Sequence, residues 1–159
     1  MRKWIALAGL VIASLCLPDA VSAQVRNGMT WSKSSHNAQF STDTVGCNGC
    51  DAYAGETSCA QALPVLCLYA DGAPNPGVPV NFYNGWARGF VYLTPPVVGS
   101  TLGSLANANA LCAANFGPGY RMAEFHDGQG GWGWQAYGNV SGAGRFWVFI
   151  NDQPANCWN

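Results

Sequence analysis

Residues 105–127 read LANANALCAANFGPGYRMAEFHD, and this stretch decides how the chain is expected to fold. Its apolar positions recur every three or four residues, at Leu105, Ala108, Cys112 and Phe116. That spacing places them on one face of an α-helix. Ser104 can cap the start of the helix, Gly117 suits the left-handed position after its end, and Pro118 cannot continue it. The sequence therefore predicts a helix over residues 105–116.

Strand-like segments lie on both sides of this helix. We expect strands over residues 64–69, 78–83, 89–94 and 120–127. Asn84-Gly85 is a strong signal for a hairpin turn between the second and third of them. Residues 146–150, FWVFI, are apolar on both faces, which is typical of a central, covered strand, and the glycine-rich residues 128–144 before them are expected to form a loop. One clear helix, 20 glycines and 9% charged residues predict an α+β domain with a small mixed or antiparallel sheet.

Residues 1–23 are typical of a secretory signal peptide. Arg2 and Lys3 give a positive start, residues 4–17 form an apolar run, and Val21-Ser22-Ala23 offers the small residues that a signal peptidase needs. The apolar run is shorter than the roughly 20 residues that a membrane helix requires. We therefore expect a secreted protein, extracellular or periplasmic, without a membrane span.

The chain after the leader is expected to divide into two parts. Residues 24–46 are small and polar, which predicts an exposed arm or linker, and residues 47–159 are long enough for a single domain with a real core. Residues 24–159 together contain five Lys and Arg residues and seven Asp and Glu residues, a net charge of 5 − 7 = −2. A nucleic-acid-binding protein needs a basic surface to neutralise phosphates, so this composition excludes that class.

Six cysteines follow the leader, at Cys47, Cys50, Cys59, Cys67, Cys112 and Cys157. An even number in an exported chain predicts three disulfides, so the domain is expected to be disulfide-stabilised. A zinc site is an alternative, because Cys47 and Cys50 have the spacing of metal ligands, but Cys59 and Cys67 lie too far apart to complete it and no histidine joins them. A redox-active pair at Cys47 and Cys50 would require a strand-to-helix junction, which the surrounding Gly, Ser and Thr residues do not favour.

Glu124 and His126 are the candidate catalytic pair. On a strand they point to the same face, about 7 Å apart at their Cα atoms. A carboxylate beside an imidazole can support general acid–base chemistry, which makes a small secreted hydrolase one functional hypothesis. The alternative is structural, with Glu124 paired to Arg121 or Arg145 and His126 bonded to the backbone. We favour a protein without enzymatic activity, because no activated Ser, Thr or Cys accompanies the pair.

The loop after residues 146–150 is rich in oxygen-bearing side chains, which are the ligands that calcium prefers. The candidate calcium ligands are Asp127, Asn151, Asp152 and Asn156. The alternative is turn chemistry, because Asn and Asp bond their own backbone and Pro154 fixes a bend. Calcium is therefore a possible cofactor, and no other cofactor is expected.

Trp132 and Trp134 lie in the glycine-rich segment and are candidates for ligand contact, because aromatic faces stack on sugar rings and anchor interfaces. The alternative is that they close the core, as Trp147 is expected to do. The predicted ligand-binding set is Asp127, Trp132, Trp134, Asn151, Asp152, Gln153 and Asn156.

The segment from Leu105 onward resembles a C-type lectin-like domain. Residues 117–123, GPGYRMA, are similar to the strand start that follows the helix in that family, and residues 146–150 are similar to its aromatic strand. Asn151-Asp152 and Gln153-Pro154-Ala155-Asn156 resemble the Trp-Asn-Asp and Gln-Pro-Asp tripeptides that bind calcium and sugar in some members. The resemblance implies a disulfide between Cys112 and Cys157. It leaves the other four cysteines, Cys47, Cys50, Cys59 and Cys67, to pair among themselves.

These observations lead to three functional hypotheses. The first is a secreted, non-enzymatic recognition domain that binds an extracellular glycan or protein through the loops around Asp127–Trp134 and Asn151–Asn156. The second is the small hydrolase using Glu124 and His126. The third is a structural component of an extracellular assembly, in which the arm over residues 24–46 becomes ordered on a neighbour.

Overall fold

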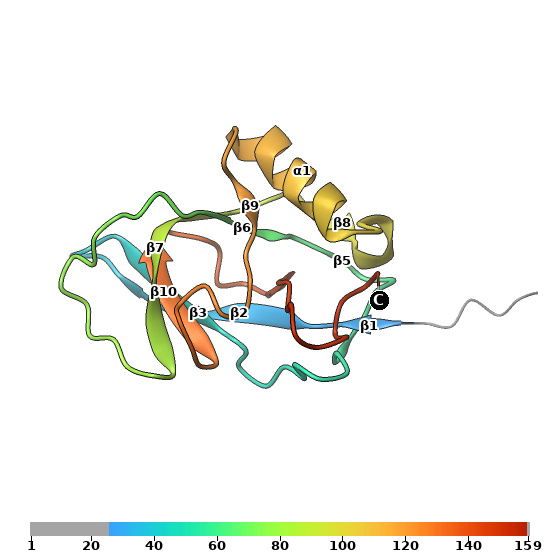
Figure 1. Ribbon diagram of the computed structural model, residues 1–159, viewed down its shortest axis with the longest axis horizontal. Coiled ribbons are helices and arrows are strands. Elements are labelled where there is room, and N and C mark those ends of the chain that lie inside the picture. The colour runs from blue at the N-terminus through green and yellow to red at the C-terminus, as the bar shows by residue number, and fades with distance from the viewer. Residues whose placement is uncertain (1–25, 159) are drawn as a thin grey trace, which may run out of the picture.

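The computed structural model describes residues 26–158, so the predicted leader over residues 1–23 lies outside the described part of the chain. The elements are β1 (Asn27–Gly28), β2 (Thr30–Asn37), β3 (Thr42–Gly46), β4 (Thr57–Ser58), β5 (Ala62–Leu63), β6 (Leu66–Tyr69), β7 (Asn84–Leu93), β8 (Val97–Val98), α1 (Leu105–Phe116), β9 (Arg121–Met122), β10 (Gly133–Tyr137) and β11 (Arg145–Trp147). A short 3₁₀ turn, Gly99–Thr101, precedes α1. Helix α1 lies over one end of the molecule, beside β6 and β9 (Figure 1). None of the helices within residues 26–158 is long and apolar enough to cross a membrane.

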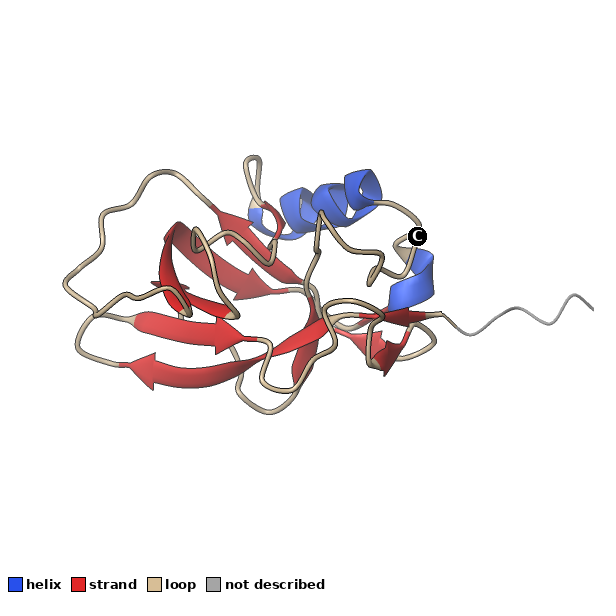
Figure 2. Ribbon diagram, turned by 60° about the horizontal axis from the view of Figure 1, so that its bottom comes forward, coloured by secondary structure: helices blue, strands red, loops and turns tan. Residues whose placement is uncertain are grey.

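A mixed seven-stranded sheet in the order β11-β2-β3-β10-β7-β6-β9 forms the body of the protein. Strands β10 and β7 pair in parallel, whereas the other neighbours in this sheet pair antiparallel. Two small antiparallel ribbons, β1 with β4 and β5 with β8, extend it. Figure 2 shows the sheet curving beneath the helix. One helix, a curled mixed sheet and three disulfides make this a small disulfide-stabilised α+β fold.

The two ends of the sheet meet where the chain leaves β11. Isolated parallel bridges join Val65 to Trp147 and Glu124 to Phe149. The backbone N–H of Phe149 donates to the carbonyl of Ala123 at 2.9 Å, and the N–H of Phe125 donates to the carbonyl of Phe149 at 2.9 Å. The residues that follow β9 are therefore held beside the C-terminal loop, which brings segments 25 residues apart in sequence to one place.

The helix prediction is confirmed. Ser104 accepts a hydrogen bond from the backbone N–H of Asn107 at 3.1 Å and caps the first turn, and Gly117 has a φ of 104° at the other end. Ala108 and Cys112 are buried on the face that packs towards β6 and β9. The helix is thus attached to the sheet by the predicted apolar stripe.

The core is rich in aromatic side chains. Trp31 from β2 lies 5.4 Å from the ring of Phe125 and 5.7 Å from the ring of Trp134, and all three side chains are buried. Phe146 from β11 belongs to the same buried cluster, whereas Trp147 packs in a separate cluster with residues of α1. Aromatic rings from β2, β10, β11 and the residues after β9 thus fill the concave side of the curved sheet and pack its two ends against each other.

The prediction of an exposed arm over residues 24–46 is wrong, because β2 and β3 lie inside the sheet. The buried polar side chains of Thr30 on β2 and Asp43 on β3 are bonded to specific partners. The Asp43 carboxylate accepts from the Lys33 ammonium at 2.8 Å, from the backbone N–H of Val140 at 2.6 Å, and contacts His36 Nδ1 at 2.7 Å. Because residues distant in sequence supply some of these partners, local polarity gave a misleading prediction.

The prediction of a hairpin at Asn84-Gly85 is also wrong. Residues 84–93 form one strand, and the turn lies earlier, where Asn81 Oδ1 accepts from the backbone N–H groups of Tyr83 at 2.8 Å and Asn84 at 3.0 Å. Residues 78–83 are therefore loop. Gly85 serves a different purpose, since a Cβ atom there would overlap the carbonyl of Gly128.

The predicted strands next to the C terminus are shorter than expected. Regular pairing covers only Arg121–Met122 of residues 120–127, and Arg145–Trp147 of the segment around residues 146–150. Asp127 ends the first strand, because its Oδ2 accepts from the backbone N–H of Glu124 at 2.7 Å and folds residues 124–127 into a turn. Phe149 continues the pairing only as an isolated bridge.

The cysteines pair as Cys47–Cys50, Cys59–Cys157 and Cys67–Cys112. The implied disulfide between Cys112 and Cys157 is wrong, and so is the pairing of the other four among themselves. Cys112 lies on the buried face of α1 and meets Cys67 on β6, whereas the C-terminal loop brings Cys157 to Cys59 beside β4. Because all six sulfur atoms are bonded, the zinc alternative at Cys47, Cys50, Cys59 and Cys67 is excluded in this state of the protein.

Candidate ligand-binding groove

An aromatic groove of about 380 Å³ opens beside the junction of residues 124–126 with the C-terminal loop. It is lined by Ala52, Tyr53, Phe82, Phe125, His126, Gly130, Gly131, Trp132, Ile150, Asp152 and Gln153. Three of its aromatic side chains are unusually exposed, Tyr53 at 62%, Phe82 at 70% and Trp132 at 41%. Phe125 and Ile150 are buried. The groove thus combines a buried apolar base with aromatic rings that are available to a ligand.

Trp132 is held in the groove by its backbone and by Phe125. Its carbonyl accepts from the N–H of Cys47 at 2.9 Å, at the end of β3. Its ring and that of Phe125 form a T-shaped contact, with the centroids 5.4 Å apart and the planes at 79°. An edge-to-face contact covers little of a ring face, so the Trp132 indole is positioned while remaining open to solvent.

Tyr53 projects from the loop between β3 and β4, and the Cys47–Cys50 disulfide closes the first four residues of that loop. Asp51 Oδ1 accepts from the backbone N–H groups of Tyr53 at 2.9 Å and Ala54 at 3.0 Å. These bonds, with that of Ala54 the stronger influence, lower the pKa of Asp51 below its ordinary value. The turn that carries Tyr53 therefore stabilises the ionised form of the Asp51 carboxylate.

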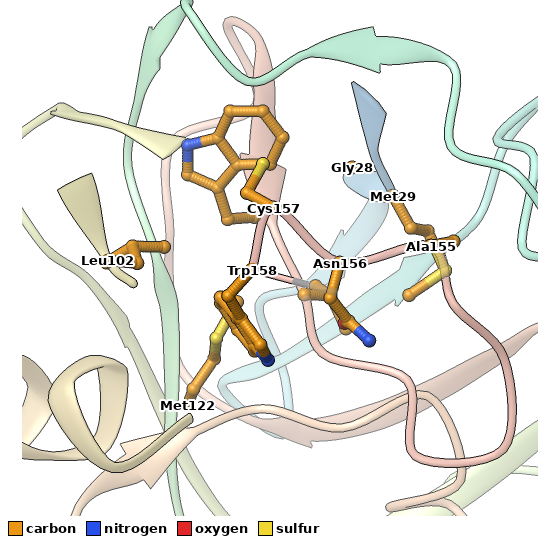
Figure 3. Close-up of a pocket in the computed structure, with 10 residues that line it drawn as sticks. Gly28, Met29, Leu102, Met122, Ala155, Asn156, Cys157 and Trp158 are labelled. Atoms are coloured by element: carbon orange, nitrogen blue, oxygen red, sulfur yellow. The ribbon is translucent and has the colours of Figure 1, made fainter. Parts of the chain in front are cut away.

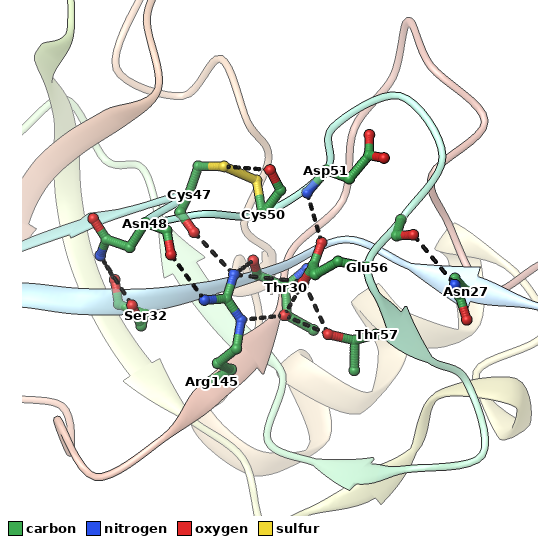
Figure 4. Close-up of polar contacts among 11 residues, drawn as sticks. Asn27, Thr30, Ser32, Cys47, Asn48, Cys50, Asp51, Glu56, Thr57 and Arg145 are labelled. Carbon is green, nitrogen blue, oxygen red and sulfur yellow. Dashed lines mark hydrogen bonds and ion pairs between the residues drawn. A yellow bond between two sulfur atoms is a disulfide. The ribbon is translucent and has the colours of Figure 1, made fainter.

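Arg145 anchors the same loop from below, as Figure 4 shows. Its guanidinium donates to the carbonyl of Cys47 at 2.9 Å and to that of Asn48 at 3.1 Å, and it also bonds the side chain of Thr30 at 2.6 Å. Glu56 lies 3.4 Å from the same group and accepts the backbone N–H of Asp51 at 2.8 Å. One planar cation thus ties β11, β2 and the loop that carries Tyr53.

Phe82 reaches the groove from the long loop before β7. Its backbone lies against Gly131, where a Cβ atom would overlap the Phe82 carbonyl and where φ is 67°. A side chain at this position would push the Phe82 loop away from Trp132, so glycine is required for the close approach. The ring of Phe82 meets that of Tyr83 edge-on, with the centroids 5.3 Å apart.

The polar side of the groove contains His126, Asp152 and Gln153. The imidazole Nδ1 of His126 lies 2.9 Å from Glu124 Oε1, and its Nε2 lies 3.8 Å from Asp152 Oδ2. Glu124 and His126 are therefore paired as the sequence predicted, although through a turn instead of a strand. Two carboxylates flank one imidazole, an arrangement that offers both donors and acceptors to a ligand.

The structural alternative for Glu124 is wrong, because neither arginine pairs with it. Arg121 forms a two-point ion pair with Asp127, and Arg145 is engaged with Glu56. Burial alone would lower the pKa of the Arg121 guanidinium, but the hydrogen bond and charge of Asp127 raise that pKa above its ordinary value. The Glu124 carboxylate instead interacts with the imidazole of His126.

The structure places three of the seven predicted ligand-binding residues in the groove, Trp132, Asp152 and Gln153. Trp134 is fully buried, and its Nε1 donates to the carbonyl of Glu124 at 3.2 Å, so the prediction that it contacts a ligand is wrong. Asp127 lines a separate hollow beside α1, with Arg121 and Asn109. Asn151 is exposed next to the groove residue Asp152.

Asn156 is a structural residue, which contradicts its predicted place in the ligand-binding and calcium sets. Its buried amide accepts from the backbone N–H of Ile150 at 3.1 Å and donates to the carbonyl of Ile150 at 2.9 Å. With Asp127 bonded to Arg121, the four proposed calcium ligands are not assembled. Within residues 26–158, no three His, Cys, Asp or Glu side chains come together as metal ligands do.

A small hollow near the C terminus belongs to the core. Figure 3 shows Met29, Met122 and Trp158 around it, together with Asn156 and Cys157. Its volume is about 10 Å³, which is the space of about one water molecule. The C-terminal tail therefore closes the apolar interior, and the ligand-binding capacity lies in the larger groove.

Sequence reasoning missed Tyr53 and Phe82, two of the three exposed rings of the groove. Tyr53 lies in the segment for which the cysteines predicted only disulfides, and Phe82 lies in residues 78–83, which were predicted to be a strand. A large aromatic residue inside a turn-rich loop was the available indication, because such a loop offers no core in which to bury it.

Comparison with known proteins adds no assignment to this geometry. A scan against protein-family models, a search of curated proteins and a search of solved structures found no match for this chain.

Proposed function

We propose that this protein is a secreted recognition domain that binds an extracellular glycan in the aromatic groove. The observation that carries the proposal is the convergence of three exposed rings, Tyr53, Phe82 and Trp132, on one hollow that also contains hydrogen-bonding side chains. Large aromatic side chains exposed together are uncommon on a protein surface without a binding role. The volume of about 380 Å³ is in the range of small-ligand sites.

The chemistry of the groove suits sugars because it combines flat apolar faces with polar groups. Sugar rings present C–H faces that pack on aromatic rings, and hydroxyl groups that both donate and accept. His126, Asp152 and Gln153 supply both kinds of partner on one side of the groove. Secretion is part of this proposal and is supported by the leader-like residues 1–23 and by the three disulfides.

A C-type lectin-like fold is a further proposal, supported by the helix over residues 105–116 and by the pairing of residues 123–125 with Phe149. The calcium-dependent sugar site of some members of that family is not carried over to this chain. Asn156 is occupied by the backbone of Ile150, and Asp127 by Arg121.

The test is a glycan array followed by calorimetry with the glycans that bind. Trp132→Ala is expected to weaken binding about 5- to 30-fold, which corresponds to about 1–2 kcal/mol for the loss of a stacking ring. Trp132→Phe should retain most of the affinity because it keeps a flat face. Tyr92→Ala is the matched control, because Tyr92 is exposed to 47% and lies outside the groove.

Two results would overturn the proposal. One is an array on which no glycan binds, while an extracellular protein binds with Trp132 dependence, because the groove would then be a protein-binding site. The other is glycan binding that Trp132→Ala and Tyr92→Ala leave equally unchanged. Chemical denaturation of each variant separates loss of binding from loss of folding.

A second candidate, a small secreted hydrolase, is favoured by one observation. His126 lines the groove and lies 2.9 Å from Glu124, an arrangement in which a carboxylate can orient an imidazole that acts as a general base. Turnover of a bound oligosaccharide, detected chromatographically and abolished in both His126→Ala and Glu124→Ala, would support it. Intact ligand after prolonged incubation with the wild-type protein would exclude hydrolysis of that ligand.

A further inference from the structure

A second hollow of about 450 Å³ lies next to the aromatic groove and shares Phe82 with it. Trp86, Arg88 and Gln129 line this hollow together with Asn81. Phe82 lies between the two hollows, because its ring lines both. A ligand that stacks on this ring can extend into the groove on one side and into the second hollow on the other. The two are therefore neighbouring parts of one binding surface.

The charge of the second hollow is positive. Arg88 lines it, and no Asp or Glu of the described residues does. Three of the other four cations within residues 26–158 are paired, Lys33 with Asp43, Arg121 with Asp127 and Arg145 with Glu56, and the fourth, Arg26, is exposed and lies outside this hollow. Arg88 forms no ion pair within residues 26–158. An unpaired guanidinium in a hollow is a natural partner for an anion.

The uncharged polar group of Asn81 favours an anion as well. Its Oδ1 already accepts from two backbone N–H groups, those of Tyr83 and Asn84. What the side chain can still offer a ligand is its amide N–H, a donor. Gln129 adds another amide to the same hollow. A ligand oxygen that carries negative charge would therefore find donors from more than one residue.

The backbone fixes where Arg88 emerges. The pairing of β7 with β10 shifts register between Trp86 and Phe90, so Arg88 lies in a bulge of β7 with a φ of 59°. Its carbonyl accepts from the N–H groups of Gly72 and Ala73, each at 3.0 Å, which holds this left-handed conformation in place. Bulges redirect side chains, and such strained residues concentrate at functional sites.

Gln129 has the same kind of backbone on the other wall, with a φ of 70°. Its N–H donates to the carbonyl of His126 at 2.8 Å, which links this wall to the polar side of the groove. Four residues other than glycine have positive φ among residues 26–158, namely Ser41, Asn48, Arg88 and Gln129. The two with long side chains both line this hollow, so its walls are held in conformations that these residues rarely adopt.

We propose that the second hollow is an anion subsite of the same groove, and that the ligand is an acidic oligosaccharide whose carboxylate meets Arg88 while a neighbouring ring packs on Phe82 and Trp132. This inference rests on the proposed glycan-binding function and specifies its ligand class. The free carboxylate of a uronic acid has the charge and planar shape that a guanidinium binds through two hydrogen bonds.

The experiment uses uronic acid tetrasaccharides and their methyl esters, which have the same ring and length but lack the charge. Wild-type protein is expected to bind the acid form at least about tenfold more tightly than the ester at low ionic strength, a preference that should shrink as salt is added. Arg88→Ala should remove the preference, and Arg88→Lys should restore part of it. Arg26→Ala is the matched control, because Arg26 is exposed and lies outside both hollows.

The outcomes separate this inference from the proposed function. Equal binding of acid and ester by the wild-type protein would overturn the anion subsite, and so would an acid preference that Arg88→Ala leaves intact. If Trp132→Ala still weakened sugar binding in either case, the proposed glycan-binding function would stand without the anion subsite. A Trp132→Ala variant that binds every sugar normally would overturn the groove itself. An oligoglutamate peptide that binds with the same Arg88 dependence and more tightly than the sugars would overturn the ligand class.

Discussion

Polar side chains at single positions carry much of the structural organisation of this protein. Asp43 is buried beneath Lys33 and His36, and Arg145 holds three segments at once. Asn156 holds the C-terminal loop by bonding both backbone groups of Ile150. These side chains are costly to lose, because each removal leaves buried groups without partners.

The Asn156→Ala substitution tests this at the residue scale. It leaves the N–H and carbonyl of Ile150 unpaired in a buried environment, so the free energy of unfolding should fall by about 2–3 kcal/mol. Asn151→Ala, a change of the same kind at an exposed position of the same loop, should cost less than about 0.5 kcal/mol. Urea denaturation measures both, and equal costs would show that the Asn156 amide does not hold the loop.

Among the elements, the loop between β3 and β4 connects stability with the binding site. The Cys47–Cys50 disulfide links its first residues, Arg145 bonds its backbone, and it carries Tyr53 into the groove. The Cys67–Cys112 disulfide lies elsewhere in the fold, where it joins α1 to β6. The two bonds are therefore expected to contribute differently to stability and to function.

Replacing each pair by alanine distinguishes these contributions. Cys67 and Cys112 are 45 residues apart, so removing their bond should cost about 3–4 kcal/mol of unfolding free energy. Cys47 and Cys50 are separated by 3 residues, and removal should cost about 1–2 kcal/mol but should weaken glycan binding, because the Tyr53 loop is released. Thermal unfolding and calorimetry measure the two effects. Unchanged binding after loss of Cys47–Cys50 would show that this bond does not position Tyr53.

The turn that carries Tyr53 should also respond to acid. The bonds from the backbone N–H groups of Ala54 and Tyr53 lower the pKa of Asp51, so they favour the folded turn above the ordinary carboxyl pKa and are lost as the pH falls through the lowered value. The Tyr53 and Ala54 amide NMR signals should therefore shift only below about pH 4. In Asp51→Asn, whose side chain accepts without titrating, these shifts should be absent. The amide of Asp51 itself reports separately on Glu56.

The elements that could be predicted are those whose signal is local. The helix over residues 105–116 has its apolar stripe, cap and stop within one continuous segment, and it was predicted with its ends correct. Strands β2 and β3 were missed because partners such as Val140 and Arg145, which satisfy their polar groups, lie about a hundred residues away. The Cys67–Cys112 bond was missed for the same reason, since only the packing of α1 on β6 reveals it.

The groove was predicted only in part. Trp132, Asp152 and Gln153 were identified because they lie in loops rich in glycine or polar residues, whereas Trp134, two residues from Trp132, is buried. Trp134 lies within β10, whereas Trp132 precedes that strand, and the sequence contains no sign of where the strand begins, because glycine occurs on both sides of Trp132. Tyr53 and Phe82 come from loops whose meeting depends on the curl of the sheet.

At the scale of the whole molecule, exposed aromatic side chains gather in two places. One is the groove, and the other is formed by Tyr69 and Tyr92, which cluster with the half-buried rings of Phe116, at the end of α1, and Tyr120. In the cluster the rings stack on each other, with Tyr69 and Tyr120 centred 5.2 Å apart and Tyr92 and Phe116 5.3 Å apart. Stacked rings cover each other's faces, so the groove, where Trp132 meets Phe125 only edge-on, is the better surface for a sugar.

The most direct test of this account is a two-dimensional NMR titration of the isotope-labelled protein with the tightest-binding glycan from the array. The account predicts that the largest shifts map to Tyr53, Phe82, His126 and Trp132, including the Trp132 indole N–H, and that they saturate together. Shifts concentrated on Tyr69, Tyr92 and Tyr120, with the groove signals unmoved, would contradict it and would place the binding surface beside α1.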